Sequence, residues 1–374
     1  MNCFLVRRAT KMRAFRTLIT IGILIVMASL PLILRLRQPP PLSPLPRPPD
    51  LLLRFGLIAD IQYVDAKDAW DSLKTRRRFY RSGLSRLKEA VDLWRAEEVD
   101  GVFQLGDLVD GSSLRLNQRD ADFARILQVA AFCPFPWYHL VGNHERYSFG
   151  ESEIREWTGR AANLNMGNDN YYRFSPSPAF MVVVLNSYEI SVNIKEDKDD
   201  GKIDGKNDYD FDRFSEARAI LSNKNENDND NSPKGLEGLD RRWVALNGGL
   251  GREQLSWFNK SLHLAKSKGQ KVIVLSHVPL HPEGLTDAMN LAWDYDRALD
   301  VIKGVKGVVV VALAGHDHEG GVHFSGEYGV LFFTLSSVLE SRSRAFAVCD
   351  IFADRLDIRG FGDLKSASMK FVAS

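Results

Sequence analysis

Acidic, amide and imidazole side chains occur in five short runs that are spread over most of this 374-residue chain. The runs are Asp60-Ile61-Gln62, Gly106-Asp107-Leu108-Val109-Asp110, Gly142-Asn143-His144-Glu145, Ser276-His277 and Gly315-His316-Asp317-His318. They offer oxygen and imidazole donors without a thiolate, which suits Mn, Mg, Fe or Zn and argues against a thiolate zinc site. This set predicts a hydrolytic site with two metal ions about 3.5–4 Å apart, which hold the attacking and leaving oxygens of an in-line displacement.

Asp107 is the candidate for the carboxylate between the two ions. A bridging ligand needs two oxygens, so only Asp or Glu can fill that position, and Asp107 lies on the tight turn after Gly106. Each ligand has a structural alternative: Asp60 could cap a helix, Asn143 could occupy a left-handed turn, and His277 could be a satisfied core histidine. Five ordered runs at strand ends argue against a joint coincidence.

Four of the runs follow hydrophobic stretches that must position them. The stretches are residues 53–59, 99–105, 272–275 and 308–314. Short β-branched runs with helical patterns between them predict strands that are buried on both faces and linked by crossover helices, which is an α/β fold. In such folds the ligand site lies beyond the carboxyl ends of the strands, so the five runs are expected to converge there.

The five runs resemble the calcineurin-like metallophosphoesterases. The pattern of that superfamily is Asp-x-His, Gly-Asp-x-x-Asp, Gly-Asn-His-Asp/Glu, a lone His and then Gly-His-x-His, and this chain has all five blocks in that order. The resemblance implies a two-sheet β-sandwich core flanked by helices. It also implies that one metal is held by Asp60, Gln62, Asp107 and His318, and the other by Asp107, Asn143, His277 and His316.

The same resemblance implies that His144 faces the phosphate, as general acid or as a stabiliser of charge on the leaving oxygen. Asp110, three residues after Asp107, stands where purple acid phosphatases have a metal-binding Tyr, so it argues against that branch. We expect Asp110 to orient His144 through a hydrogen bond, as carboxylates commonly do for histidines in metal sites. The alternative is an Asp that stabilises the turn.

Gln62 departs from the general pattern, because most members of the superfamily have a His ligand there. An amide oxygen is a harder and weaker donor than an imidazole, so the change favours Mn or Mg over Zn. The chain resembles the manganese-dependent ADP-ribose/CDP-alcohol diphosphatases over roughly residues 53–362. The matching stretches are 55–62, 75–81, 246–249, 253–255 and 290–295. Members of that branch cleave the diphosphate linkage of ADP-ribose or CDP-choline-type compounds to a nucleoside monophosphate and a phosphorylated sugar or alcohol.

Two other functions are compatible with the sequence. A phosphomonoesterase or cyclic-nucleotide phosphodiesterase would use the same ligands. A non-catalytic interaction scaffold is disfavoured because His144 and all seven ligand positions are filled. Of the consecutive Arg76, Arg77 and Arg78, we expect at most one to meet substrate phosphates.

The charge distribution separates the N-terminus from the rest of the chain. Residues 1–49 contain seven Arg and one Lys without an acid, whereas the remainder holds 41 basic and 48 acidic residues. The larger part is therefore mildly acidic, and it lacks the basic stripe that tracks nucleic acid. Its length and the 44% hydrophobic content fit one large domain, residues 51–374. We expect its polar segment, 195–232, to be a solvated and partly disordered insertion.

Residues 1–37 are predicted to be a membrane anchor or targeting segment. Residues 17–34 form an uncharged apolar run of 18 residues, close to the ~20 that span a bilayer. The heavier cluster of basic residues lies upstream, which favours a cytoplasmic N-terminus with the enzyme on the other side. A cleaved signal peptide and an Arg-rich organelle transit peptide are the alternatives. Residues 38–50, rich in Pro, are predicted to be an extended linker.

Overall fold

The computed structural model describes residues 42–71, 74–151, 153–156, 170–193 and 208–371. The predicted anchor or targeting segment, 1–37, lies outside them, as does the start of the Pro-rich linker. Within the described residues, no helix is both long and apolar enough to cross a membrane.

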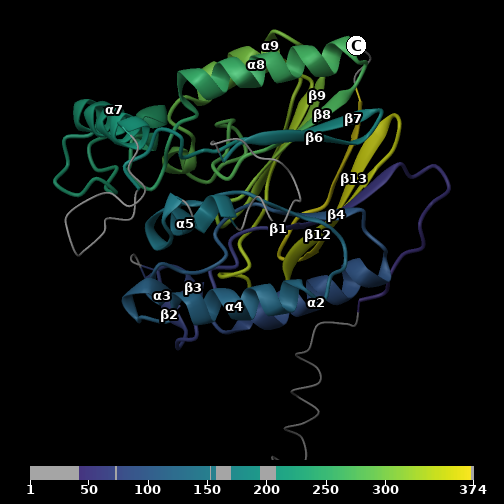
Figure 1. The fold of residues 1–374 in the computed structure, drawn as a ribbon, viewed down its shortest axis with the longest axis horizontal. Helices are drawn as coiled ribbons and strands as arrows, with labels where there is room; N and C mark the ends of the chain where they lie inside the picture. Colours follow the sequence, from purple (N-terminus) through teal and green to yellow (C-terminus); the bar gives the residue numbers. More distant parts are fainter. Residues whose placement is uncertain (1–41, 72–73, 152, 157–169, 194–207, 372–374) are drawn as a thin grey trace, which may run out of the picture. The chain divides into compact units, whose positions relative to one another are not determined.

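Two six-stranded mixed sheets form the centre of the domain (Figure 1). The first sheet has the order β14 (Ala367–Lys370), β13 (Arg355–Gly362), β12 (Ala345–Ile351), β1 (Leu53–Ile58), β4 (Gly101–Gln104) and β5 (Trp137–His139). The second has the order β10 (Gly321–Ser325), β11 (Val330–Thr334), β9 (Val309–Ala314), β8 (Lys271–Leu275), β7 (Phe180–Val184) and β6 (Tyr172–Ser177). The four hydrophobic stretches form β1, β4, β8 and β9, as predicted.

The two sheets pack face to face, as the family resemblance implied. Phe55 and Leu57 of β1 share one buried cluster with Ile273 and Leu275 of β8. In a strand, alternate side chains point to opposite faces, so each of these pairs lies on the face toward the other sheet. Full burial of side chains of this size contributes about 1.5–3 kcal/mol each. The sandwich core therefore fixes the two sheets against one another.

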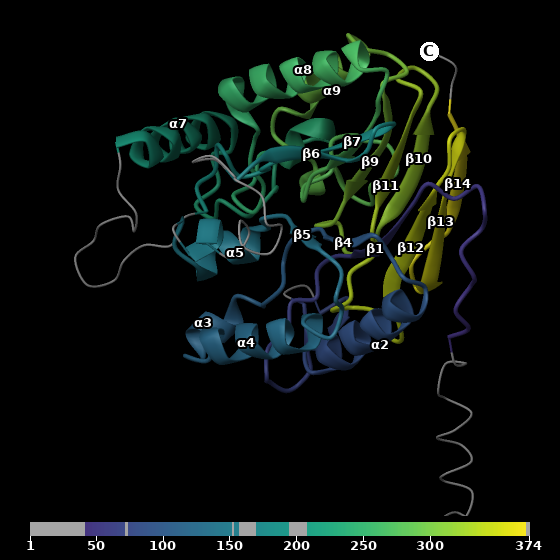
Figure 2. The ribbon, with the colours of Figure 1, turned by 45° about the vertical axis from the view of Figure 1, so that its right-hand side comes forward.

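Helices cover the two outer faces (Figures 1 and 2). The first sheet is covered by α2 (Ser82–Ala96) and α4 (Arg119–Ala130), and the second by α8 (Gly251–Ser267) and α9 (Tyr295–Lys303). Trp94 of α2 is fully buried, and its indole N–H donates to the Ala347 carbonyl oxygen at 3.0 Å. Its ring occupies the space where a side chain at Gly56 would lie, so that strand position requires glycine.

Helices join the parallel strands at every connection except that from β9 to β11, where β10 intervenes, so the predicted crossovers are confirmed at the other connections. β1, β4 and β5 run parallel, and so do β7, β8, β9 and β11. Helix α2 links β1 to β4, α3 (Ser112–Arg115) and α4 link β4 to β5, and α9 links β8 to β9. The carboxyl ends of the parallel strands in each sheet therefore meet at one edge.

The shorter elements include α5 (Asn143–Ser148), the hairpin of β2 (Ala69–Trp70) and β3 (Arg77–Arg78), and the 3₁₀ helices η1 (Gly238–Arg242) and η2 (Ala288–Asn290). In the polar segment, residues 195–207 lie outside the described part, and α7 (Asp208–Lys224) follows them. Ala217 and Leu221 of α7 are buried with Trp243. The later part of that segment is therefore packed and not wholly solvated.

The end of the Pro-rich linker is attached to the domain. The Leu45 N–H donates to Glu97 Oε1 at 3.0 Å, and Arg47 forms an ion pair with Asp100 at 2.8 Å. Arg54, which is buried, donates to the Leu45 carbonyl oxygen. From Leu45 onward the segment is consequently part of the folded domain.

Candidate metal centre

The five runs converge where the carboxyl ends of the two sheets meet. Asp60 and Gln62 follow β1, Asp107 follows β4, and Asn143 begins α5 after β5, all in the first sheet. The second sheet supplies three histidines: His277 follows β8, and His316 and His318 follow β9. The site therefore exists only where the two sheets are packed together.

Asp107 lies among the other predicted ligands. One donor atom each of Asp60, Asp107 and His277 lie within 4.8 Å of one another, and all three residues are buried. His277 Nε2 is 3.6 Å from Asp107 Oδ2, and the Gln62 amide nitrogen is 2.9 Å from the same oxygen. His318 Nε2 is 3.7 Å from Asp60 Oδ1. Asp107 thus has predicted ligands of both metals beside it, which fits a bridging position.

The Gln62 side chain has the reach of a ligand. Its Nε2 lies 3.0 Å from His318 Nε2, and its Oε1 has no hydrogen-bond partner among the described residues. The oxygen and nitrogen of an amide group have nearly the same size and can exchange places by a half-turn of the group. Such a turn would bring Oε1 beside Asp107 and His318. Two oxygen donors and an imidazole nitrogen then face the same point, as a divalent cation requires.

Each of the three predicted imidazole ligands has an oxygen atom close to one of its ring nitrogens. His277 Nδ1 is hydrogen-bonded to the Leu105 carbonyl oxygen (2.6 Å) and His316 Nε2 to Asn247 Oδ1 (2.8 Å), while His318 Nδ1 lies 2.9 Å from Glu340 Oε1 in an ion-pair contact. Such acceptors take the ring proton and leave the lone pair on the other nitrogen, as is usual for metal-ligating histidines. Asn247 and Glu340 were not identified from the sequence, although 246–249 was noted as a matching stretch.

Backbone strain is concentrated at the predicted ligands. Asp60, Gln62, Asp107 and His316 have φ angles of 52°, 40°, 60° and 66°. This left-handed region is uncommon for residues other than glycine, and unusual backbone conformations that are held in place cluster at functional sites. Two motif glycines make room for these side chains: a methyl group at Gly106 would overlap His277 Nδ1, and one at Gly142 would overlap Asp107 Oδ1.

The buried carboxylates of the centre are not balanced by positive charge on the neighbouring imidazoles. Burial, together with the nearby charge of Asp107, raises the pKa of Asp60 well above its ordinary value. Burial lowers the pKa of His277 and His316, so these imidazoles are neutral near pH 7. Carboxylates held together beside neutral imidazoles are the donor set of a site for divalent cations. The residues present therefore fit two metal ions.

Glu145, to which the sequence reasoning gave no role, holds the centre together. It is fully buried and accepts hydrogen bonds from the backbone N–H groups of Asp107, Leu108 and Gly142 at 2.7, 2.7 and 2.8 Å. Burial and the charge of Asp107 raise the pKa of Glu145 to about 8, although the three N–H groups oppose this. The signal in the sequence is its position three residues after Gly142, where a capping box places Glu at the start of a helix.

His144 lies at the edge of the centre with its outer nitrogen fixed. Its Nδ1 accepts a hydrogen bond from the Gly111 N–H at 2.8 Å, so the proton of the neutral ring is on Nε2. Nε2 is 3.9 Å from Asp107 Oδ2. The ring thus presents an N–H donor toward the predicted metals.

The hydrogen bond expected between Asp110 and His144 is absent. Asp110 Oδ2 is 3.9 Å from His144 Nδ1, which is too long, while Oδ1 accepts from the Ser112 N–H and hydroxyl at 2.8 and 2.5 Å. The Gly111 N–H already occupies the nitrogen that Asp110 was expected to bind. Burial by itself would raise the pKa of Asp110, but His144, the Ser112 hydrogen bonds and Arg78 hold it below its ordinary value. Asp110 therefore stabilises the turn and acts on His144 only through its charge.

Comparisons with known proteins agree with this geometry. A family model described as calcineurin-like phosphoesterase matches residues 53–320. A manganese-dependent ADP-ribose/CDP-alcohol diphosphatase from Danio rerio is 34% identical over 334 residues, which cover 86% of this chain and 99% of that protein. Proteins of the same name from Homo sapiens and Arabidopsis thaliana are 31% and 33% identical, over 86% and 85% of this chain and 93% and 97% of their own lengths.

A solved structure supports the same relationship. The crystal structure of a dimetal phosphatase from Danio rerio superposes with a TM-score of 0.79 at 32% identity, and the match covers 86% of this chain and all of that one. The chain thus belongs to the calcineurin-like phosphoesterases and, within them, to the family of the manganese-dependent ADP-ribose/CDP-alcohol diphosphatases.

Proposed function

We propose that this protein is a manganese-dependent hydrolase that cleaves the diphosphate linkage of ADP-ribose or CDP-alcohols. The products would be a nucleoside monophosphate and a phosphorylated sugar or alcohol. The proposal is carried by the donors gathered around Asp107, which include Gln62 and its neighbour His318. The names of the relatives support the substrate class.

Two ions are assigned to the ligands as the family pattern implies. The first would be held by Asp60, Gln62, Asp107 and His318, and the second by Asp107, Asn143, His277 and His316. When bound, such ions polarise the phosphate and supply a water nucleophile that is active near neutral pH. The Gln62 oxygen favours Mn over Zn at the first of them.

His144 would stabilise the charge that develops on the leaving phosphate oxygen. The hydrogen bond from the Gly111 N–H keeps the single ring proton on Nε2, which faces Asp107. The neutral ring would therefore donate a hydrogen bond to that oxygen and keep its proton. A preorganised donor of this kind contributes about 10²–10³-fold to a rate.

Replacing Asp107 tests the assignment of the bridge. Asp107→Asn removes the charge and one strong oxygen donor, so we expect the purified variant to lose two-metal binding and hydrolysis together. Metal content by atomic emission and turnover of ADP-ribose measure the two effects. Asp68→Asn, a partly exposed Asp in an ion pair with Arg77, is the matched control and should keep both. Two bound ions and near-normal turnover in Asp107→Asn would show that Asp107 is not the bridging ligand.

Replacing His144 separates charge stabilisation from metal binding. For His144→Ala we expect metal content to persist, because the ring is not a proposed ligand, while turnover falls by about 10²–10³-fold through the loss of one hydrogen-bond donor. His263→Ala, at an exposed position of α8, is the control and should behave like the unmodified protein. An unchanged rate in His144→Ala would exclude His144 from the reaction.

A substrate panel distinguishes the proposed activity from the other phosphoesterase functions. We expect ADP-ribose or CDP-choline to be hydrolysed in the presence of Mn²⁺ with a higher kcat/KM than cyclic AMP or a simple phosphomonoester. Release of AMP or CMP, followed by chromatography, identifies the bond that is cut. Preference for the cyclic nucleotide or the monoester would contradict the proposal.

We also propose that residues 17–34 anchor the protein to a membrane by a single span. The apolar run and the basic residues on both sides of it support this. A fluorescent protein fused after residue 50 should then remain in the membrane fraction after an alkaline carbonate wash. Release of the fusion, or its appearance inside an organelle without the leader, would indicate a removable presequence.

A further inference from the structure

The three histidines at the centre differ in the charge of their acceptors. His277 donates to a backbone carbonyl and His316 to an amide oxygen, which are both neutral. His318 instead has a carboxylate, Glu340, 2.9 Å from its Nδ1. Among these three histidines, a carboxylate therefore stands only behind the one that shares a proposed metal with Gln62.

We propose that Glu340 is a positioning residue that strengthens His318 as a ligand and offsets the weak amide donor at Gln62. A carboxylate behind a ligating imidazole fixes its orientation and raises its basicity. The first metal has a single imidazole, whereas the second has His277 and His316. Glu340 then sets the affinity of the first metal, an inference that rests on the proposed two-metal function.

Glu340 is itself held in place by cations. Its side chain is only 7% exposed, with Arg76 Nε 3.2 Å from Oε2 and Arg78 Nε 3.7 Å from Oε1. The two guanidinium groups place positive charge beside the carboxylate and balance its negative charge in this buried position. Arg77 points elsewhere, to Asp68, at 3.6 Å.

The loop that carries Glu340 is bonded to the backbone of the first metal's ligands. The Leu339 N–H donates to the Asp60 carbonyl oxygen at 3.0 Å, and the Ser337 N–H donates to that of His318 at 2.9 Å. The Glu340 N–H is 3.2 Å from Ser337 Oγ. Glu340, Asp60 and His318 therefore share one rigid set of hydrogen bonds.

The test is the affinity of the two sites for Mn²⁺, measured by calorimetry on the full chain. Glu340→Gln keeps the shape of the side chain but removes its charge. We expect one of the two sites to weaken by about 10–100-fold, with the other unchanged and the Tm of the metal-free protein unaltered. Glu319→Gln removes an exposed carboxylate next to His318 and 3.7 Å from Arg76, so it is the matched control. Wild-type affinity at both sites of Glu340→Gln would overturn the inference.

A second variant tests the compensation directly. Gln62→His supplies an imidazole donor, so Glu340→Gln should weaken the first site much less in that background. An equal loss of Mn²⁺ affinity with Gln or His at position 62 would show that Glu340 has only a structural role. A loss of affinity accompanied by a lower Tm of the metal-free protein would show the same. A wild-type chain that binds fewer than two Mn²⁺ ions would refute the proposed function itself.

Discussion

The repulsion between buried carboxylates is the constraint on which the centre depends. Asp60 and Asp107 are almost completely buried and lie within 4.8 Å of one another. At an effective dielectric constant of about 20, two like charges about 4 Å apart repel by roughly 4 kcal/mol. Divalent cations between them, as proposed, would turn this repulsion into attraction. Their binding would also give a reason for the left-handed backbone at Asp60, Gln62 and Asp107, which costs about 1–3 kcal/mol at each residue.

The sandwich makes this arrangement possible because each sheet supplies part of the donor set. The first sheet contributes oxygen donors and the second contributes imidazoles, so a shift of one sheet against the other would separate them. Contacts across the interface fix the register: the His277 ring is bonded to the Leu105 carbonyl oxygen, and the His316 N–H lies 3.1 Å from Asp60 Oδ2. The buried core between the sheets and the site at its end are therefore one cooperative structure.

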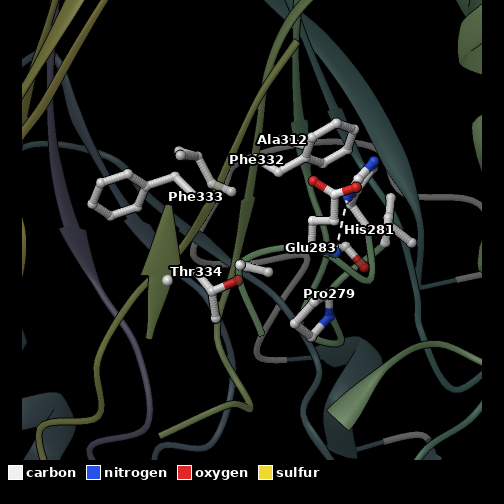
Figure 3. Close-up of a pocket in the computed structure, with 13 residues that line it drawn as sticks. Pro279, His281, Glu283, Ala312, Phe332, Phe333 and Thr334 are labelled. Carbon is white, nitrogen blue, oxygen red and sulfur yellow. Dashed lines mark hydrogen bonds between the residues drawn. The ribbon is translucent and has the colours of Figure 1, made fainter. Parts of the chain in front are cut away.

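A small pocket lined in part by Ser276 and Ala314, which lie in or beside the ligand runs, bears a second set of polar groups. Figure 3 shows His281 and Glu283 beside Phe332 and Pro279 in this pocket of the second sheet. The rings of His281 and His323 stack at 4.7 Å, and the Glu283 N–H donates to His281 Nδ1. Stacked rings do not converge on a common ligand, so this pocket is a packing feature of β11 and the loop after β8.

The strands and the ligand runs were predictable because their signals are local. β-branched stretches such as 309–311 read as strands, and spacing identified the motifs. The two-sheet sandwich and the assignment of ligands to the two metals were predicted only from the family resemblance. The remaining strands of the two sheets were not identified, among them the edge strands β10 and β14 and the antiparallel strands β12 and β13. β13 alternates buried with more exposed residues, as an antiparallel strand with one face on the core does.

Contacts between distant residues were the part that the sequence could not supply. Glu340 and Asn247 stand in no spaced motif with the histidines that they contact, and only the folded chain brings them together. The predicted hydrogen bond between Asp110 and His144 was wrong for a similar reason. In the folded chain the Gly111 N–H donates to His144 Nδ1, the nitrogen that Asp110 was expected to bind. Glu145 was also given no role, although a Glu three residues after the start of a helix is a local signal that the sequence does contain.

The two-metal centre is tested most directly by a crystal structure of the protein grown with Mn²⁺, with anomalous diffraction data that locate the metal. We expect two peaks about 3.5–4 Å apart, with Asp107 between them and the Gln62 oxygen bound to one. A single peak, or two peaks that do not share Asp107, would contradict the proposed centre.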